Sequence, residues 1–335
     1  MIRIALDMMG GDNAPSSIIN GVINFLKEHK NGEVELHLVG SMLDNLKILM
    51  NEGWYSERGI NSDKIIHDKY ASIQLYKSTQ IVDYKDRPSR IIKTKPNSSM
   101  NISINLLKEG IVDAVISAGN TGCLLASSFF NLGMIKGIKR PALFAFIPSE
   151  NGNFLICDVG ANSSAKPEHL LQFGKMASIY MKFQMKINQP KIGLLNIGSE
   201  ENKGNELSKN SFNLLSENLE NFIGNIESRY IFDGKTDIVL CDGFTGNIVL
   251  KLIEGMAQYN LNLISSKLKL DNNKIVKDIK KIYNYEQYGA TPILGVEGLV
   301  FKSHGSSSEK GIKNAIKTAY KVSKINLIDK FKKSK

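Results

Sequence analysis

Six short stretches of the chain combine glycine with hydroxyl, amide, carboxyl, imidazole or ammonium side chains, the groups that bind anions and transfer protons. Each stretch follows a short apolar run and precedes an amphipathic one, so each is expected where a strand leads into a helix. Unpaired N–H groups and the helix dipole favour negative charge at such a helix start. The residues singled out are Gly10, Gly11, Asp12, Asn120, Thr121, Gly122, Asn162, Lys203, Gly204, Asn205, Asp242, Gly243, Thr245, Gly246, Asn247, His304 and Ser306.

These stretches do not carry the patterns of nucleotide-binding loops. Ser117–Gly122 matches neither the P-loop GxxxxGK[ST] nor the dinucleotide GxGxxG, so neither ATP nor NAD is implied. For any single stretch, residues that merely cap a helix are the favoured interpretation. We call each of these stretches, where a strand leads into a helix, a joint. Six polar joints in one chain together indicate a cleft lined with hydrogen-bond donors for a phosphate-sized group.

The elements that would position these residues follow from the alternation of short apolar runs with amphipathic stretches. This order predicts an α/β fold, a three-layer α/β/α sandwich with a mostly parallel sheet that binds ligands at the carboxyl ends of its strands. No linker divides the chain, so one continuous fold is expected. The expected strands are Ile2–Leu6, Glu35–Val39, Ala114–Ser117, Leu143–Ile147, Phe154–Asp158, Ile192–Asn196 and Ile238–Cys241. The expected helices are Ser16–Glu28, Asn101–Glu109, Thr121–Met134, Pro167–Met181, Glu206–Asn218 and Asn247–Lys267.

Composition narrows the class of protein. The formal net charge of +10 would suit a nucleic acid, an anionic membrane or an acidic protein partner. No RNP-like aromatic cluster, zinc-finger spacing or heptad occurs, which argues against nucleic acid. The three cysteines show no CxxC spacing, so neither a disulfide framework nor a zinc site is expected. The sequence has no membrane-spanning apolar run and no secretory pattern at its start, and we expect a cytoplasmic protein.

The segment at about 263–285 differs from the rest of the chain. It places Ile275, Val276, Ile279 and Ile282 in one apolar stripe among lysines. A basic amphipathic helix of this kind can lie on an anionic membrane. A surface helix that packs on its neighbours or on a second subunit explains the pattern equally well. The segment is expected to protrude from the main fold.

Longer blocks of sequence surround the polar stretches. They are ALDMMGGDNAP, SAGNTGCLLA, RPAL, DVGAN with KPEHLLQF, LLNIGSEENKGN, VLCDGFTGNIVLKLIEG and LGVEGLVFKSHGSSSEKGIKNAI. In content and order they resemble the signature blocks of bacterial phosphate acyltransferase, the acyl-ACP:phosphate transacylase of phospholipid synthesis. The resemblance covers nearly the whole chain and implies a single phosphate acyltransferase domain over residues 1–335. Met8 and Cys123, where the family usually has Ala, are modest departures.

The resemblance implies a reaction and a set of partners. The reaction is reversible transfer of a long-chain fatty acyl group from acyl carrier protein to inorganic phosphate, which gives acyl phosphate for phosphatidic acid and phospholipid synthesis. The implied fold is similar to that of phosphotransacetylases and isocitrate/isopropylmalate dehydrogenases, and the implied assembly is a homodimer. Family members supply a membrane glycerol-3-phosphate acyltransferase, and some contact the anionic membrane peripherally. No nucleic acid, metal or organic cofactor is expected.

Roles for the phosphate-binding residues follow from this implied reaction, in which a phosphate oxygen attacks a thioester carbonyl. The reaction needs an oriented dianion, donors for the developing oxyanion and a proton for the leaving thiolate. We expect Lys203, with Gly204 and Asn205, at the phosphate. Asn120, Thr121 and Gly122 would form a second wall. Because phosphate is already a competent nucleophile, the reaction requires neither a covalent enzyme intermediate nor a metal.

Four further residues receive expected roles. Asn162 and Asn247 would be neutral donors to the phosphate or the carbonyl. His304 is the candidate proton donor, since imidazole titrates near neutral pH, and a turn residue is its alternative role. Cys123 is expected to pack rather than to form an acyl-enzyme, because the family usually has Ala there.

Three rival functions fit parts of the sequence. A phosphotransacetylase acting on short acyl-CoA would use the same chemistry, and the signature blocks argue against it. A metal-dependent decarboxylating dehydrogenase would need clustered Asp ligands and a cofactor loop, which the sequence lacks. A basic protein that only docks on membranes would leave the six polar joints unexplained.

Overall fold

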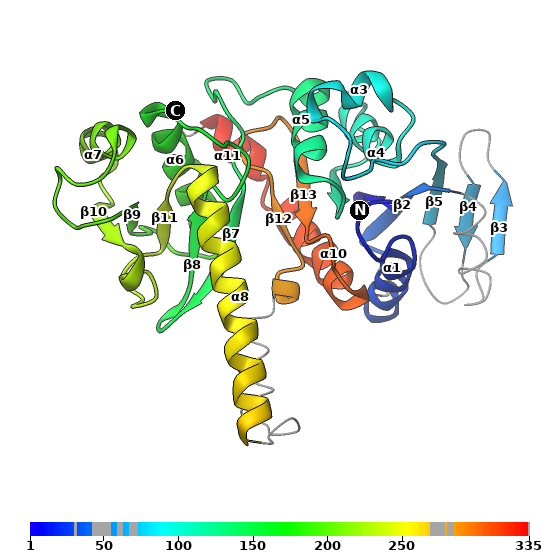
Figure 1. The fold of residues 1–335 in the computed structure, drawn as a ribbon. Coiled ribbons are helices and arrows are strands. Elements are labelled where there is room, and N and C mark those ends of the chain that lie inside the picture. The colour runs from blue at the N-terminus through cyan, green and yellow to red at the C-terminus, as the bar shows by residue number, and fades with distance from the viewer. Residues whose placement is uncertain are drawn as a thin grey trace. The chain divides into compact units, whose positions relative to one another are not determined.

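The computed structural model describes residues 1–29, 32–41, 55–58, 63–66, 73–268, 279 and 285–333. The chain forms two compact units: unit 1 consists of Met1–Gly137 and Tyr288–Lys335, and unit 2 of Ile138–Gln287. Each unit is built on its own sheet (Figure 1). The chain therefore leaves unit 1 after Gly137, forms unit 2, and returns to complete unit 1.

Unit 1 contains a sheet of strand order β12-β13-β6-β1-β2-β5-β4-β3. The strands from β13 to β5 are parallel to their neighbours, whereas β12, β4 and β3 pair antiparallel at the edges. The elements of unit 1 are β1 (Ile2–Asp7), α1 (Ser16–Glu28), β2 (Val34–Gly40), β3 (Tyr55–Arg58), β4 (Asp63–Ile66), β5 (Ile73–Lys77), η1 (Pro88–Arg90), α3 (Ile91–Thr94), α4 (Ser99–Lys108), β6 (Ala114–Ser117), α5 (Thr121–Leu132), β12 (Ala290–Pro292), β13 (Leu299–Ser303), α10 (Glu309–Lys324) and α11 (Leu327–Lys333).

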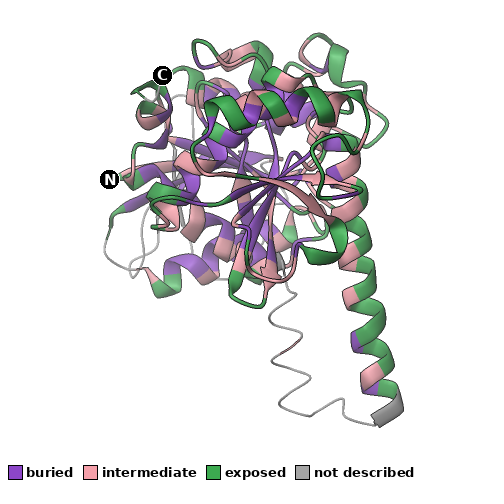
Figure 2. Ribbon diagram, turned by 90° about the vertical axis from the view of Figure 1, so that its left-hand side faces the viewer, coloured by how far each residue is buried: buried purple, intermediate pink, exposed green. Residues whose placement is uncertain are grey.

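Helices cover both faces of this sheet. α1 packs against α10 on one face, and α4 packs against α5 on the other (Figure 1). In α10, Ile312, Ala315, Ile316 and Ala319 are all buried, and their spacing of three and four residues makes one apolar face that contacts the strands. All four residues of β6 are buried, as expected for a strand that helices cover on both faces. Figure 2 shows buried residues on the central strands and exposed residues on the outer sides of the helices.

Unit 2 contains a smaller sheet of strand order β10-β9-β11-β8-β7. Its strands are parallel except β7, which pairs antiparallel with β8. The elements of unit 2 are β7 (Phe144–Ser149), β8 (Gly152–Cys157), α6 (Pro167–Gln184), β9 (Ile192–Asn196), α7 (Glu206–Asn218), β10 (Phe222–Glu227), η2 (Ser228–Tyr230), β11 (Ile238–Leu240), α8 (Gly243–Leu268) and η3 (Tyr285–Gln287).

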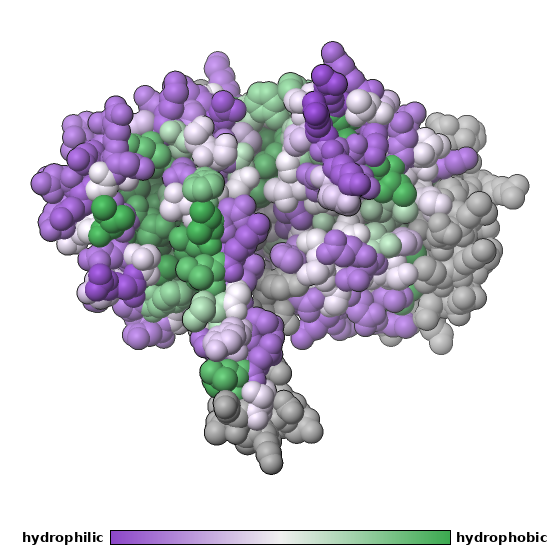
Figure 3. Space-filling view, viewed as in Figure 1, coloured by the Kyte–Doolittle hydropathy of each residue, from purple (hydrophilic) through white to green (hydrophobic). Residues whose placement is uncertain are grey.

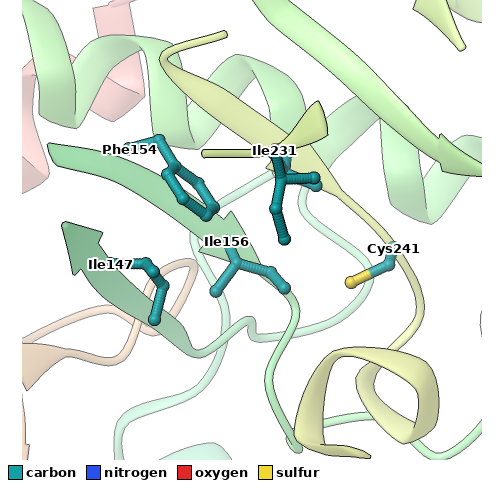
Figure 4. Packing of buried hydrophobic residues seen from close by; sticks show 6 residues of the cluster. Ile147, Phe154, Ile156, Ile231 and Cys241 are labelled. Carbon is teal, nitrogen blue, oxygen red and sulfur yellow. The ribbon is translucent and has the colours of Figure 1, made fainter. Parts of the chain in front are cut away.

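The core of unit 2 has two sides, because side chains alternate along each strand. Val249 and Ile253 of α8 pack on a buried cluster from β7, β8, β11 and the chain beside them: Ile147, Phe154, Ile156, Ile231, Val239 and Cys241 (Figure 4). The opposite face is covered by α6. Gly174 allows α6 to approach β11 closely, since a Cβ at Gly174 would lie 3.1 Å from Leu240 Cδ1.

The α/β class with mostly parallel strands and helices on both sides is confirmed. α1, α7, β6 and β9 have the bounds predicted from the sequence. The sequence predicts one sheet, whereas the structure has two, and the single domain over residues 1–335 stays a prediction. Of the segment at about 263–285, α8 includes the first part, and residues 269–278 and 280–284 lie outside the described residues. No helix in the described ranges is both long and apolar enough to cross a bilayer.

Candidate functional site

Three of the six polar joints lie in unit 1, and they meet. They follow β1, β6 and β13, which are parallel neighbours in the sheet order β13-β6-β1. Parallel neighbours end at the same edge of a sheet, so topology alone brings the three joints together. The Asp12 N–H donates to Gly305 O at 2.8 Å, which ties the first joint to the third.

Two glycines make this close approach possible. A Cβ at Gly10 would lie 2.7 Å from Gly119 N. Gly11 has φ +104°, and a Cβ there would lie 2.9 Å from Gly305 O. Such distances leave no room for a side chain, and a positive φ favours glycine. The glycine pair therefore lets the backbone of the first joint touch the other two.

Asp7, the last residue of β1, is buried beneath these joints. Its carboxylate accepts hydrogen bonds from Ser99 Oγ at 2.5 Å, Ser117 Oγ at 2.6 Å and Met9 N at 3.3 Å. Burial raises the pKa of Asp7, and the hydrogen bonds from Ser117 and Ser99 oppose that rise. Asp7 thereby fixes the ends of β1 and β6 and the start of α4 relative to one another.

Lys302 is a cation at the same edge of the sheet, one that the sequence analysis missed. It lies near the end of β13, and its Nζ donates to Ala118 O at 3.3 Å and to Ser303 O. Burial lowers the pKa of Lys302 to about 8, although the charges of Asp7 and Asp12 oppose the shift. A lysine inside the apolar run Leu299–Ser303 was the signal in the sequence that could have revealed it.

His304 and Ser306 follow Lys302 on the surface of the same joint. His304 Nδ1 lies 2.8 Å from Ser306 Oγ, and both residues are exposed. Ser308 caps α10 by accepting from Gly311 N, so the His304–Ser306 turn lies directly before the helix. Asn13 Nδ2 donates to Ser306 O at 3.3 Å and links this turn to the first joint. We call these residues the unit 1 cluster: Asp7, Gly10, Gly11, Asp12, Ser117, Gly119, Lys302, His304, Gly305 and Ser306.

Asn120 opens α5 beside the unit 1 cluster. Its Oδ1 accepts from Cys123 N at 3.1 Å, so Asn120 is the helix cap that the alternative interpretation expected. Within the described part of the chain, the N–H groups of Thr121 and Gly122 have no hydrogen-bond acceptor. Unpaired N–H groups in a first helical turn are suited to bind an anion.

In unit 2, Asp158 organises the joint after β8. Its carboxylate accepts from the N–H groups of Leu143, Gly160 and Ala161 at 2.9–3.2 Å. It also accepts from both the N–H and the Nδ2 of Asn162 at 2.8 Å. Burial raises the pKa of Asp158, and these hydrogen bonds oppose the rise. Asn162 Nδ2 donates in addition to Pro141 O at 2.7 Å, so the amide predicted as a ligand donor already holds the loop.

The joint after β11 packs onto this loop. The Gly243 N–H donates to Asn162 O at 2.9 Å, and a Cβ at Gly243 would lie 2.7 Å from Asp158 Oδ2. Asn247, one turn into α8, lies against Gly160: its Nδ2 would be 3.4 Å from a Cβ there. We call these residues the unit 2 cluster: Asp158, Gly160, Asn162, Gly243, Gly246 and Asn247.

Asp242 and Thr245 start α8 beside the unit 2 cluster. Asp242 accepts from Thr245 N at 3.0 Å and from Thr245 Oγ1 at 2.8 Å. This is the geometry of a helix cap, so both side chains serve to cap the N-terminus of α8.

Lys203 lies on the joint that follows β9. In the sheet of unit 2, β9 is a neighbour of β11. The side chain of Lys203 is 48% exposed, and its Nζ is 3.9 Å from Glu200 Oε1, a loose ion pair. Asn196 Nδ2 donates to Lys203 O at 3.1 Å, Gly204 takes φ +88°, and Asn205 caps α7 by accepting from Ser208 N. The joint thus presents the Lys203 ammonium to solvent on an ordered loop.

The cysteines do not have the surroundings of nucleophiles. All three are buried and unpaired with one another. Burial raises the pKa of Cys123 to about 11, and its thiol donates to Asp86 O at 3.6 Å. This agrees with the packing role expected for Cys123. Among the described residues, no group of three or more His, Cys, Asp or Glu side chains is placed to hold a metal ion.

Comparison with solved structures identifies the class of fold. A phosphotransacetylase from Streptococcus pyogenes is similar over 95% of this chain and 93% of its own, with a TM-score of 0.60 and 15% identity. A branched-chain phosphotransacylase from Enterococcus faecalis has a TM-score of 0.56 and 15% identity over 96% and 99% of the two chains. The fold is therefore that of the phosphotransacetylases.

Comparison with sequences identifies the family. The sequence model described as "Fatty acid synthesis protein" matches residues 2–330, and the chain belongs to this family. Relatives named phosphate acyltransferase are 41% identical in Acetivibrio thermocellus, over 98% of this chain and 95% of the relative, and 42% identical in Macrococcus caseolyticus, over 95% and 94%. The chain is accordingly an enzyme of the acyltransferase class.

Proposed function

We propose that the protein transfers a long-chain fatty acyl group from acyl carrier protein to inorganic phosphate, and so makes acyl phosphate for phospholipid synthesis. The observation that carries the proposal is the unit 1 cluster, where three neighbouring strands end in glycine turns beside one half-buried lysine, Lys302. Relatives at about 41% identity that are named phosphate acyltransferase support the same reaction.

Lys302 and the start of α5 suit the anionic part of this reaction. Phosphate must be held as an oriented dianion, and charge that develops on the thioester oxygen must be met by fixed donors. The Lys302 ammonium is held against two carbonyl oxygens, so its position is set before a ligand arrives. The N–H groups of Thr121 and Gly122 are the fixed donors of the same edge.

For Lys203 and His304 we propose the roles predicted from the sequence. Lys203 is an exposed cation flanked by Gly204 and Asn205, so it can bind phosphate without first breaking a tight ion pair. His304 is an exposed imidazole beside Ser306 Oγ, and it would protonate the leaving thiolate. Asn247 remains a proposed neutral donor, because its amide lies over Gly160 at the edge of the unit 2 cluster.

The reaction is tested with purified protein, palmitoyl-ACP and phosphate, without added metal or nucleotide. We expect phosphate-dependent release of free acyl carrier protein, with acyl phosphate trapped by hydroxylamine as the hydroxamate. A parallel assay supplies acetyl-CoA in place of palmitoyl-ACP. Turnover of acetyl-CoA alone would assign the chain to the phosphotransacetylases by activity, and no turnover of either thioester would reject the proposal.

A homodimer is part of the proposed function, and α8 provides its interface. Six large apolar residues are 40–63% exposed along one face of this helix: Phe244, Ile248, Leu252, Met256, Tyr259 and Leu263 (Figure 3). Exposed apolar stripes of this length mark interaction surfaces. The same stripe on a second copy can cover it when the two helices pair about a two-fold axis.

Peripheral contact with an anionic membrane rests on the sequence alone. The apolar and basic residues that suggest it lie mainly outside the described residues, so the contact stays a prediction. Flotation of the protein with vesicles that contain anionic lipid, compared with neutral vesicles, tests it. A membrane glycerol-3-phosphate acyltransferase remains the proposed consumer of the product.

A further inference from the structure

A strongly basic, exposed segment lies between β5 and α4. From Ile81 to Lys95 the chain carries five basic and two acidic residues. Lys85, Arg87, Arg90 and Lys93 are all exposed. Arg90 lies in η1 and Lys93 in α3, whereas Lys85 and Arg87 lie in the short stretch directly before η1.

Among the described residues, no acidic side chain neutralises the four exposed cations. Asp86 is paired with Lys95 at 2.6 Å, and Asp83 accepts from the backbone N–H of Lys85. Across the described ranges, no ion pair joins any of the four exposed cations to an acidic side chain. A cluster of unpaired cations attracts an acidic partner.

Two apolar side chains lie on the surface of the same segment. Tyr84 is 79% exposed and Ile81 is 50% exposed. The Lys85 ammonium stands 5.4 Å from the centre of the Tyr84 ring. Apolar and aromatic contacts within a polar, charged rim are typical of protein–protein surfaces. We call Ile81, Tyr84, Lys85, Arg87, Arg90 and Lys93 the basic surface.

The basic surface is attached directly to a joint of the candidate site. Asn120 Nδ2 donates to Asp83 O and to Tyr84 O at 3.4 Å each, while Asn120 Oδ1 caps α5. Pro88 packs on the first turn of α5, since a Cβ at Gly122 would lie 2.8 Å from Pro88 Cγ. A partner bound here is therefore held beside the N-terminus of α5.

We propose that the basic surface docks the acidic carrier protein that delivers the acyl thioester, an inference that rests on the proposed function. An acyl group on a carrier protein arrives on a flexible arm, and the carrier must be held close to the reacting groups for the arm to reach them. An acidic helix with a few apolar side chains complements four cations around Tyr84 and Ile81. Steered association of this kind weakens as salt rises.

The test is direct binding of fluorescently labelled acyl carrier protein, followed by anisotropy at low and high salt. The variant Arg87→Glu/Arg90→Glu reverses two charges of the basic surface. The matched control is Lys108→Glu/Lys321→Glu, which reverses two exposed lysines of unit 1 near the C-terminal ends of α4 and α10. We expect the first variant to raise the Kd at least about tenfold at low salt and the control to leave it within about twofold.

The outcomes separate this proposal from the proposed function. Equal weakening by both variants would show a general charge effect and overturn the docking site, as would no weakening by either. If the surface variant instead lost only its binding to anionic vesicles, the surface would belong to a membrane contact and the proposal would fail. The hydroxamate assay on the unaltered protein decides the reaction independently, because it does not depend on where the carrier binds.

Discussion

Two lysines stand at strand-to-helix joints in contrasting surroundings. Lys302 is held against backbone carbonyls next to Asp7 and Asp12, whereas Lys203 is half exposed and only loosely paired with Glu200. A cation held by backbone carbonyls is fixed before a ligand binds, and an exposed cation can move toward the ligand. The two lysines therefore allow separate tests of the chemistry and of the stability of the fold.

Replacement of Lys203 by alanine is expected to remove activity and leave stability unchanged. The exposed side chain contributes little to folding, because a loose surface ion pair stabilises by no more than about 1 kcal/mol. Loss of a phosphate ligand should lower kcat/KM by about 100-fold or more. Urea unfolding and the hydroxamate assay measure the two effects. Glu200→Ala, which removes only the partner of Lys203, is the control, and full activity in Lys203→Ala would refute its assigned role.

The stability of the protein should depend on Lys302 above pH 8. Burial lowers the pKa of Lys302 to about 8 in the folded protein, from 10.5 for a free lysine. Between these values the unfolded chain binds more protons, so the folded state gains stability as pH rises. Below pH 8 both states are charged and this dependence disappears.

Comparison with Lys302→Met isolates this effect from other titrating groups. The free energy of unfolding, measured with urea from pH 7 to pH 10, should rise in the unaltered protein relative to the variant once pH exceeds 8. A difference between the two proteins that is constant over this range would contradict the assigned surroundings of Lys302.

At the scale of residues, the sequence located the joints better than it assigned their side chains. Asn120, Asn205 and Asp242 occur where glycine and polar residues predicted them, yet all three accept hydrogen bonds as helix caps. Capping and ligand binding require the same residue types, so sequence cannot separate them. Lys302 and the serines on Asp7 were missed because their roles arise from contacts between elements distant in the sequence.

At the scale of elements, the start of α8 depends on close packing against the unit 2 cluster. Gly243→Ala should destabilise the protein by about 1–3 kcal/mol, because a Cβ there would lie 2.6 Å from Asn162 O. Urea unfolding measures the change. Gly255→Ala in the same helix is the control, since nothing lies within 4 Å of its added Cβ. It should stabilise the helix by up to about 1 kcal/mol, and destabilisation of equal size at both positions would contradict this account.

Most elements could be predicted because their apolar periodicity is strong. α1 and α7 begin and end where the pattern changes, and β6 and β9 are short apolar runs with polar ends. β10 was missed because it reads FIGNIE, and none of its residues is fully buried. A strand at the edge of a sheet lacks the continuous apolar run that identifies a central strand.

At the scale of the whole molecule, the α8 stripe should determine the oligomeric state. Leu252→Lys places a charge at the middle of the stripe, which should raise the dimer dissociation constant by at least about tenfold. Light scattering after size-exclusion chromatography measures it. Gln258→Lys, an exposed polar position on the same helix but outside the stripe, is the control. A dimer that resists Leu252→Lys would require a different interface.

The division into two units could not be predicted from the sequence. No change in composition marks Gly137 or Tyr288, because each unit alternates strands and helices in the same way. The division depends on β13, which pairs with β6 in unit 1 although unit 2 separates them in the chain. Pairing between such distant segments leaves no local signal.

The place of β13 has a consequence for how each new copy is made. Strands β1 to β6 leave the ribosome long before Leu299–Ser303, so the edge of β6 lacks its neighbour throughout the synthesis of unit 2. α1 likewise lacks its packing partner α10 until the end of synthesis. Unit 2, in contrast, is one continuous segment that can fold as it emerges. An open strand edge is a site for aggregation. The part of a nascent chain that precedes unit 2 is therefore the part most in need of chaperones until β13 has been made. Chains that end before β13 would keep the edge of β6 open permanently.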